Sequence, residues 1–307
     1  MNTGTIGDSP ISVVICTRDR GSSIVDTVAS VLRDSDAGCE LLVVDQSQGI
    51  DTKTSLERFR GDPRFSYLHS NEPGLSRGRN LGITQIRGEI IAFTDDDCDV
   101  PGNWIESIAE AFRIDPHVQL VFGCVIAAPH DSSKGFIPCY EIKEPFMGRV
   151  LRDKYRIDGM GACMAVRREA WSNLSGFDPY LGAGSPLRSA EENDFAFRSL
   201  IAGYWIYETP SIQVSHRGFR LHEETAAIVF GYLYGTGAMF AKHFRLGSRG
   251  MMPLMARILW RWAFQRPRVK YSASGRRLLR LSSFCSGWRA GMRIPIDRST
   301  GHFTLLR

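Results

Sequence analysis

Three consecutive aspartates, Asp95, Asp96 and Asp97, are the strongest chemical signal in the sequence. Their carboxylates would repel one another unless a cation lay between them. Oxygen ligands of this kind suit Mg²⁺ or Mn²⁺, which usually keeps water ligands and bridges substrate phosphates. In an extended chain Asp95 and Asp97 point to the same side, so one can bind the metal while the other holds a water or a sugar hydroxyl. A solvated acidic turn is the alternative interpretation.

The triplet follows a predicted buried strand over residues 89–94, which would place it at a strand end. Four more apolar runs are predicted strands: Ile11–Thr17, Leu41–Val44, Phe65–His69 and Val118–Ala127. Helices are predicted between them over 24–32, 54–59 and 76–86, and after Pro101. This alternation is typical of parallel βαβ units in a doubly wound sheet. Ligands bind such sheets at the carboxyl ends of the strands, which here carry Thr17, Arg18, Asp45 and the triplet.

A second acidic cluster, Glu191, Glu192 and Asp194, lies in the other half of the chain. It precedes a predicted helix over 195–202, and a charged helix cap that begins at Ser189 is the alternative interpretation. His216 follows a predicted strand over 212–214. A lone histidine there is more often only a polar strand end, although an imidazole can also bind Mn²⁺.

Several segments, taken in order, resemble family 2 glycosyltransferases, which have the GT-A fold. They are Val13–Arg20 with its T-R-x-R turn, Val43–Ser47, Gly74–Gly82, Phe93–Asp97, Gly176–Asp178, Glu191–Phe195 and Val214–His216. The resemblance covers residues 10–220. It implies an α/β fold with a doubly wound mixed sheet flanked by helices. It also implies an inverting transfer of a sugar from a nucleotide sugar to an acceptor hydroxyl.

The resemblance assigns donor and metal ligands by position. The nucleotide sugar would contact Thr17, Arg18, Asp45, Arg79, Asp95 and Asp96. Asp45 would accept the imide N–H of uracil or thymine, so a UDP- or dTDP-linked donor is expected. Arg79, on a helix that begins near the diphosphate, would favour phosphate. Asp97, Asp95 and His216 would bind Mn²⁺ or Mg²⁺. Asp19 and Arg20 are interpreted only as turn residues.

The second cluster would supply the general base. Family members carry a Glu-Asp pair at the tip of a helix beneath the acceptor, and here Glu192 replaces the usual aspartate. The catalytic candidates are therefore Glu192, Glu191 and Asp194, and the base is either Glu192, which we favour, or Glu191. The acceptor would be a hydroxyl of a glycan or of a lipid-linked glycan.

Charge divides the chain unevenly. Residues 217–307 carry 17 Lys and Arg against three acidic residues, a net charge of +14, whereas residues 1–216 have a net charge of −9. We expect a domain over 1–220, with a nucleotide-sugar half over 10–130 and an acceptor half over 131–220, and a basic amphipathic helical extension over 221–307. The uncharged stretch Thr225–Ala241 is at the lower limit for spanning hydrocarbon.

The extension has two main interpretations. Arg257 and Arg261 lie beside Trp260, Trp262 and Phe264, as in an interfacial helix on an anionic membrane surface. A soluble helical cap is the alternative. A nucleic-acid binder would leave the aspartate triplet unexplained, so no nucleic-acid partner is expected. A non-catalytic protein that binds nucleotide sugars or carbohydrates on the same fold is the other functional alternative.

Composition excludes several classes of protein. The chain of 307 residues is 43% hydrophobic and 23% charged, so it can form a core. Its seven widely spaced cysteines contain no C-x-x-C, which argues against a disulfide framework or a zinc knuckle. Residues 1–10 lack the layout of a secretory signal. We therefore expect a cytoplasmic protein, peripheral on the inner face of the plasma membrane.

Overall fold

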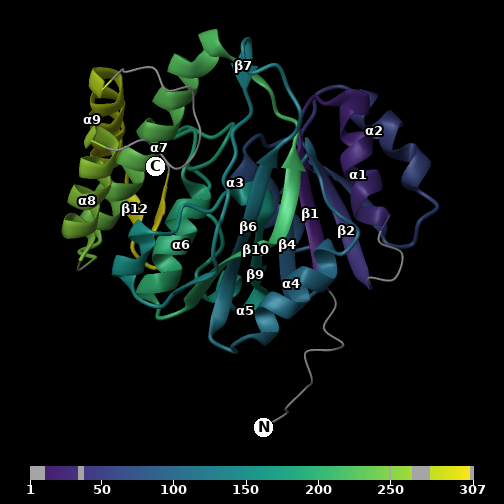
Figure 1. Cartoon of the computed structure of the whole chain (residues 1–307), viewed down its shortest axis with the longest axis horizontal. Helices are drawn as coiled ribbons and strands as arrows, with labels where there is room; N and C mark the ends of the chain where they lie inside the picture. Colours follow the sequence, from purple (N-terminus) through teal and green to yellow (C-terminus); the bar gives the residue numbers. More distant parts are fainter. Residues whose placement is uncertain (1–10, 34–37, 249, 265–276, 305–307) are drawn as a thin grey trace.

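A mixed sheet of nine strands forms the centre of the molecule (Figure 1). The computed structural model describes residues 11–33, 38–248, 250–264 and 277–304. The strand order is β3-β2-β1-β4-β9-β6-β10-β5, and β8 pairs with β10. Helices cover both faces, and the last three helices lie together at one side of the sheet.

The first half of the chain forms the parallel part of the sheet. Its elements are β1 (Ile11–Thr17), α1 (Val25–Leu32), β2 (Cys39–Asp45), α2 (Asp51–Leu56), β3 (Phe65–His69), α3 (Leu75–Ile83), β4 (Ile90–Asp95), β5 (Cys98–Asp99), α4 (Trp104–Arg113) and β6 (Val118–Ala127). β1 pairs in parallel with β2 and β4, and β2 with β3. Nearly every residue of β1, β2 and β4 is buried, as β-branched runs between two helical layers should be. The predicted doubly wound arrangement is confirmed here, although α3 ends at Ile83 instead of residue 86.

The second half makes the sheet mixed. Its elements are β7 (Gly135–Phe136), β8 (Phe146–Gly148), β9 (Met164–Arg167), α5 (Arg168–Asn173), α6 (Glu191–Ile201), β10 (Trp205–His216) and β11 (Arg220–Leu221). β9 inserts between β4 and β6 and is antiparallel to both. The strand predicted over 212–214 is only the end of the longer β10. The helix predicted from Phe195 begins four residues earlier, so both Glu191 and Glu192 lie in its first turn.

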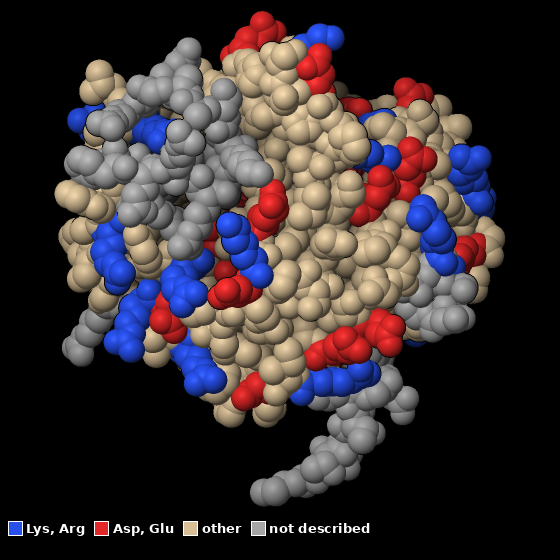
Figure 2. Space-filling view, in the orientation of Figure 1, with Lys and Arg blue, Asp and Glu red and all other residues tan. Residues whose placement is uncertain are grey.

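The extension comprises α7 (Thr225–Arg245), α8 (Met251–Phe264), α9 (Arg277–Arg293), β12 (Ile296–Asp297) and β13 (His302–Phe303). Glycines let α7 and α9 approach closely, because a Cβ at Gly287 would lie 1.8 Å from the Tyr234 carbonyl oxygen. Figure 2 shows several Lys and Arg side chains, with Asp and Glu between them, at the lower left of the molecule. None of the described helices, α7 included, is long and apolar enough to cross a membrane. The side chains of Arg261, Trp262 and Phe264 lie outside the described residues.

The extension shares a core with the acceptor half. Leu187 and Phe197 pack with Met239 and Phe240 of α7, with Ile258 of α8 and with other apolar residues of the same cluster. One side of α7 is thus buried against protein, whereas Tyr232 and Phe244 are 36% and 47% exposed. The domain boundary near residue 220 remains a prediction. In the structure one apolar core contains residues from both sides of it.

A network of buried charges also joins the extension to α6. Lys242 of α7 lies 2.6 Å from an oxygen of Asp178 and 2.8 Å from one of Asp194. Asp194 also pairs with Arg198 at 2.8 Å and accepts a hydrogen bond from His243 at 3.0 Å. All five side chains are at most 9% exposed. We call these five residues the buried ion network.

Candidate active site

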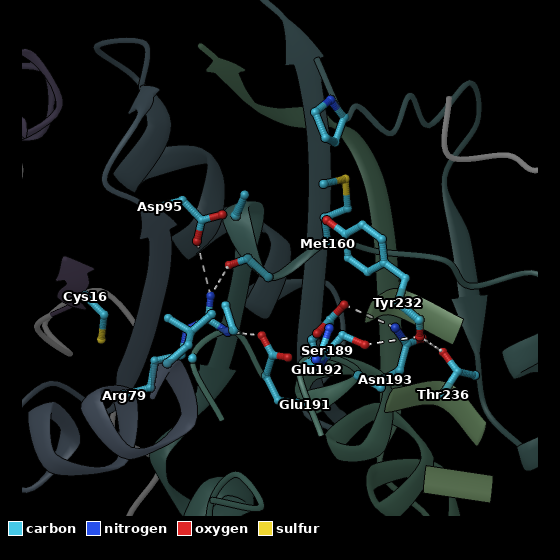
Figure 3. A pocket seen from close by; sticks show the side chains of 18 of the residues that line it. Cys16, Arg79, Asp95, Met160, Ser189, Glu191, Glu192, Asn193, Tyr232 and Thr236 are labelled. Atoms are coloured by element: carbon cyan, nitrogen blue, oxygen red, sulfur yellow. Dashed lines mark hydrogen bonds and ion pairs between the residues drawn. The ribbon is translucent and has the colours of Figure 1, made fainter. Parts of the chain in front are cut away.

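A cavity of about 660 Å³ opens at the carboxyl ends of β1 and β4 and continues to α6 and α7. It is lined by Thr17, Arg18, Arg79, Asp95, Asp96, Asp97, Glu191, Glu192 and His216, all predicted from the sequence. The remaining two candidates, Asp45 and Asp194, are not among its lining residues. Figure 3 shows Arg79 between Asp95 on one side and Glu191 on the other.

Asp97 and His216 meet because short β5 pairs antiparallel with the end of β10, with Cys98 opposite His216. His216 Nε2 lies 3.2 Å from Asp97 Oδ1. Burial disfavours ionisation of Asp97, but the hydrogen bond and charge of His216, with Arg20, lower its pKa below the ordinary value. Burial likewise opposes charge on His216, but its hydrogen bond with Asp97 raises its pKa. We call Arg20, Asp96, Asp97 and His216 the cavity cluster.

The residues around Asp97 and His216 fit a divalent cation. His216 Nδ1 lies 2.8 Å from the Pro138 carbonyl oxygen and can donate to it, which turns Nε2 toward Asp97. A Cβ at Gly218 would lie 2.5 Å from His216 Nε2 and 2.8 Å from Asp97 Oδ2, so the glycine keeps this space open. Cys98 is the third group within reach, but burial raises the pKa of its thiol well above 9, which makes it a poor ligand.

Arg20 pairs with two carboxylates of the triplet. Its Nη2 lies 3.0 Å from Asp96 Oδ1 and 2.9 Å from Asp97 Oδ2. Asp96 is nearly buried, and burial raises its pKa to about 6, although Arg20 opposes the shift. Arg20 is therefore part of the site and not only a turn residue, which corrects the sequence interpretation. The sequence signal that could have identified Arg20 as a site residue is its place as the second arginine of the T-R-x-R turn.

Arg79 is too deeply buried for a diphosphate to reach its guanidinium freely. It is 2% exposed, and its guanidinium lies 3.3 Å from Glu191 Oε1 and 3.4 Å from Asp95 Oδ1. It also donates to the Gly161 carbonyl oxygen at 3.1 Å. Burial raises the pKa of Asp95, and Arg79 opposes this shift. Arg79 thus fixes two carboxylates in the floor of the cavity, and this geometry does not favour the expected contact with the diphosphate.

Glu191 and Glu192 differ in their surroundings. Glu191 is 6% exposed, and burial together with the neighbouring charge of Glu192 raises its pKa to about 8. Glu192 is less buried, and its Oε1 accepts a hydrogen bond from Asn193 Nδ2 at 3.1 Å. Figure 3 shows the Glu191 carboxyl turned toward Arg79, whereas Glu192 lies nearer Ser189 and Asn193.

The backbone before these carboxylates is held in an uncommon conformation. Arg188 and Ala190 have φ of 70° and 76°, which non-glycine residues adopt rarely. The Ser189 hydroxyl lies between them and is positioned to donate to the carbonyl oxygens of Gly231 and Tyr232, at 3.0 and 3.1 Å. A helix from the extension therefore helps to position the second acidic cluster.

Two predicted residues have structural partners instead. Asp45 is fully buried, and it accepts hydrogen bonds from the Ser47 amide at 2.9 Å and the Tyr67 hydroxyl at 2.8 Å. Gln46 lines the cavity but Asp45 does not. The expected contact of Asp45 with the nucleotide base therefore lacks geometric support. Asp194 belongs to the buried ion network, where Lys242 and Arg198 hold its pKa well below the ordinary value despite burial. Neither carboxylate is available to a ligand in this geometry.

Sequence reasoning also missed cavity residues on segments without a motif. Lys154, Arg188, Arg220, Tyr232 and Arg280 line the cavity together with the predicted residues. Arg188 precedes α6, Lys154 lies in a short 3-10 helix over Leu151–Tyr155, Arg220 lies in β11, and Tyr232 and Arg280 belong to the extension. Nothing in the local sequence marked them, since their place depends on how the last three helices pack against the sheet.

Comparison with known proteins agrees with the fold. The family model described as glycosyl transferase family 2 matches residues 12–174. A glucosyl-dolichyl phosphate glucuronosyltransferase of Haloferax volcanii is 31% identical over 234 residues, which are 72% of this chain and 73% of that protein. A GalNAc(5)-diNAcBac-PP-undecaprenol beta-1,3-glucosyltransferase of Campylobacter jejuni is 26% identical over 41% of each chain.

Solved structures show the same architecture. TarS of S. aureus superposes with a TM-score of 0.61 at 16% identity, over 84% of this chain and 44% of that one. A mannosyltransferase of Pyrobaculum calidifontis, in complex with GDP-Man and Mn²⁺, has a TM-score of 0.59 at 19% identity, over 91% and 74%. The predicted GT-A fold with a mixed sheet is confirmed. The chain belongs to glycosyltransferase family 2 and is an enzyme of that family.

Proposed function

We propose that the chain transfers a sugar from a nucleotide sugar to a hydroxyl of a lipid-linked acceptor, with inversion at the anomeric carbon. The observation that carries the proposal is the convergence, in one cavity, of the Asp97–His216 pair and the carboxylates of Glu191 and Glu192. A phosphate-binding end and a proton-accepting end are what glycosyl transfer requires.

The donor half would bind the nucleotide diphosphate between β1 and the cavity cluster. Thr17, Arg18 and Gln46 line the cavity on the side of β1 and β2. Arg20 and Arg220 add positive charge near Asp97. Asp97 and His216 would hold Mn²⁺ or Mg²⁺, and a cation bound there would stabilise negative charge on the departing diphosphate. The pyrimidine preference rests on Asp45 alone, so the base of the donor is left to experiment.

Glu192 is proposed as the general base. Its carboxylate is more accessible than that of Glu191 and does not pair with Arg79. It would take the proton of the acceptor hydroxyl while the oxygen attacks the anomeric carbon from the face opposite the diphosphate. Glu191, Arg79 and Asp95, in the floor of the cavity, would instead orient the donor sugar. General-base assistance contributes a factor of about 10²–10⁴ to the rate.

The two relatives described above are named for lipid-linked substrates, one with dolichyl phosphate and one with a PP-undecaprenol glycan. We extend this acceptor class to the present chain. Association of residues 221–307 with an anionic membrane surface, on its cytoplasmic side, is part of the same proposal.

A panel of nucleotide sugars tests the donor assignment. UDP-, dTDP- and GDP-linked sugars would be screened, with and without Mn²⁺, for thermal stabilisation of the protein and for release of the nucleoside diphosphate. We expect at least one donor to stabilise the protein and to be hydrolysed slowly, in a metal-dependent manner. A non-catalytic binding protein would be stabilised by a donor without any turnover, which would refute the transferase assignment.

The general base is tested by Glu192→Gln, which keeps the size of the side chain and removes its basicity. We expect transfer to fall by about 10²–10⁴-fold, with nucleotide affinity unchanged. Glu223→Gln serves as the matched control, since Glu223 is exposed on the extension and does not line the cavity. Transfer by Glu192→Gln at the parental rate would show that another group is the base.

A further inference from the structure

The cavity does not stop at the carboxylates but continues along α7. Val229, Leu233, Thr236, Met239 and Phe240 line this part, and their spacing of three and four residues places them on one face of the helix. The Thr236 hydroxyl already donates to the Tyr232 carbonyl oxygen at 2.8 Å, so it offers no unpaired donor. Ile258 of α8 adds another apolar side chain. Met239, Phe240 and Ile258 also belong to the core described above and form the back of this part, whereas Val229 and Thr236 are only partly buried and form its open wall. We call these six residues the apolar recess.

Neither a nucleotide nor a free sugar accounts for the apolar recess. Both ligands are polar over most of their surface, and each would leave apolar walls facing water or poorly paired hydroxyls. Burial of hydrocarbon against such walls is favourable, because it removes apolar surface from water. The recess is continuous with the cavity that holds Glu192, so whatever fills it can belong to the same acceptor molecule.

Arg188 lines the same cavity as the carboxylates and the apolar recess. Its side chain passes along Gly231 and its guanidinium lies 5.2 Å from the centre of the Phe230 ring. Among the described residues no carboxylate oxygen lies within salt-bridge distance of it. A guanidinium with this freedom suits a phosphate, which it can bind through two parallel hydrogen bonds.

We propose that the acceptor is a sugar joined through a phosphate to a lipid, with the phosphate on Arg188 and the first part of the hydrocarbon in the apolar recess. This inference rests on the proposed transferase function and adds the acceptor's chemistry to it. Exposed apolar side chains on the same helices agree with it, since Trp260 of α8 and Leu278 and Leu281 of α9 are 61%, 84% and 47% exposed. A longer chain would leave the recess beside such residues, at a membrane surface.

Calorimetry with three small probes separates the parts of this ligand. Geranyl phosphate carries both groups, geraniol only the hydrocarbon, and inorganic phosphate only the anion. Each would be titrated into the full chain loaded with Mn²⁺ and the nucleoside diphosphate identified by the donor panel. We expect geranyl phosphate to bind at least about tenfold more tightly than either of the other probes, because both contacts are made at once.

Two variants assign the contacts. Thr236→Trp fills the apolar recess and should weaken geranyl phosphate and geraniol by about tenfold, with no effect on inorganic phosphate. Arg188→Gln should weaken both phosphate-bearing probes by about tenfold and leave geraniol unchanged. Thr84→Trp and Arg60→Gln are matched controls on exposed positions outside the cavity. Unfolding midpoints and nucleotide affinity verify that each variant is folded.

The outcomes distinguish this inference from the function on which it rests. Wild-type protein that binds nucleotide but not geranyl phosphate would overturn the inference and leave the transferase assignment intact. Equal affinity for geraniol and geranyl phosphate would overturn the role of Arg188. Unchanged binding of both lipids by a folded Thr236→Trp variant would overturn the recess. Failure of every nucleotide sugar in the donor panel would refute the proposed function, and this inference with it.

Discussion

The cavity cluster and the buried ion network use the same chemical groups in opposite ways. Each combines two aspartates with arginine and histidine, and the network adds Lys242. In the network every side chain is at most 9% exposed and each carboxylate has cationic or hydrogen-bonding partners inside the protein. In the cavity cluster Arg20 is 36% exposed at its side chain, and Asp97 lies beside space kept open by Gly218.

This difference separates a structural role from a ligand-binding one. Charges that are fully buried and mutually satisfied contribute to the unique packing of α7 on α6, and no ligand can reach them. Charges at the edge of a cavity can exchange one partner for another at a smaller desolvation cost. Residue type and motif position do not distinguish the two: the resemblance placed Asp194 among the catalytic candidates, and the structure places it in the buried ion network.

The largest effect should come from Lys242→Met. It leaves Asp178 and Asp194 buried with one cation fewer, and we expect a loss of about 3–5 kcal/mol in the free energy of unfolding, measured with denaturant. Lys134→Met is the control, because Lys134 is 74% exposed and its pairing with Asp131 should matter little. A loss below about 1 kcal/mol would show that the network does not hold α7 in place.

His302 should make stability depend on pH. Burial, with Arg198 nearby, lowers its pKa from 6.5 to about 4. Between these values the unfolded chain binds a proton that the folded protein does not, so the contribution of His302 to stability should fall as the pH decreases from 6.5 to 4, by up to about 3 kcal/mol. The carboxyls of Asp96, Glu191 and Glu208, whose pKa values burial raises, contribute with the opposite sign in this range. Asp194, with its lowered pKa, contributes only below pH 3.8.

The variant His302→Gln isolates this contribution. The unfolding free energy of the parent minus that of the variant should decrease by up to about 3 kcal/mol as the pH falls from 6.5 to 4, measured by denaturant titration at a series of pH values. His130→Gln, on an exposed histidine, should keep the parental pH dependence. Parallel curves for the parent and His302→Gln would contradict the assignment.

A smaller effect is expected for Arg20→Gln, which alters the cavity cluster. In our account the Arg20 guanidinium gives up part of its pairing with Asp96 and Asp97 and turns toward the diphosphate. The variant should bind the nucleoside diphosphate about tenfold more weakly, with little change in unfolding free energy. Arg60→Gln again provides the control. An unchanged nucleotide affinity would make Arg20 a purely structural partner of the triplet.

The sequence was most informative where a pattern is local. A buried β-branched run predicted β1 to the residue, and the predicted bounds of β3 also match the structure. The position of the triplet at the end of β4 predicted the carboxyl-end cavity. Periodicity could not tell that β9 inserts antiparallel between β4 and β6. The orientation of a strand depends on the path of the loops around it, which carries no period.

Partners were harder to predict than residue types. Asp45 and Asp194 are carboxylates in motif positions, but whether each faces a cavity depends on Tyr67 in one case and on Lys242, 48 residues further along the chain, in the other. Arg20 was dismissed as a turn residue because its two partners follow 76 and 77 residues later. Long-range contacts of this kind appear only once the fold is known.

The central claim is that the cavity cluster binds a divalent cation together with a nucleoside diphosphate. Calorimetric titration of that nucleotide into the parent and into Asp97→Asn, each with and without Mn²⁺, tests it most directly. We predict that Mn²⁺ strengthens nucleotide binding to the parent by at least about tenfold and has no effect on binding to Asp97→Asn, while both proteins unfold at similar denaturant concentrations. Equal enhancement by Mn²⁺ in the two proteins would contradict the account.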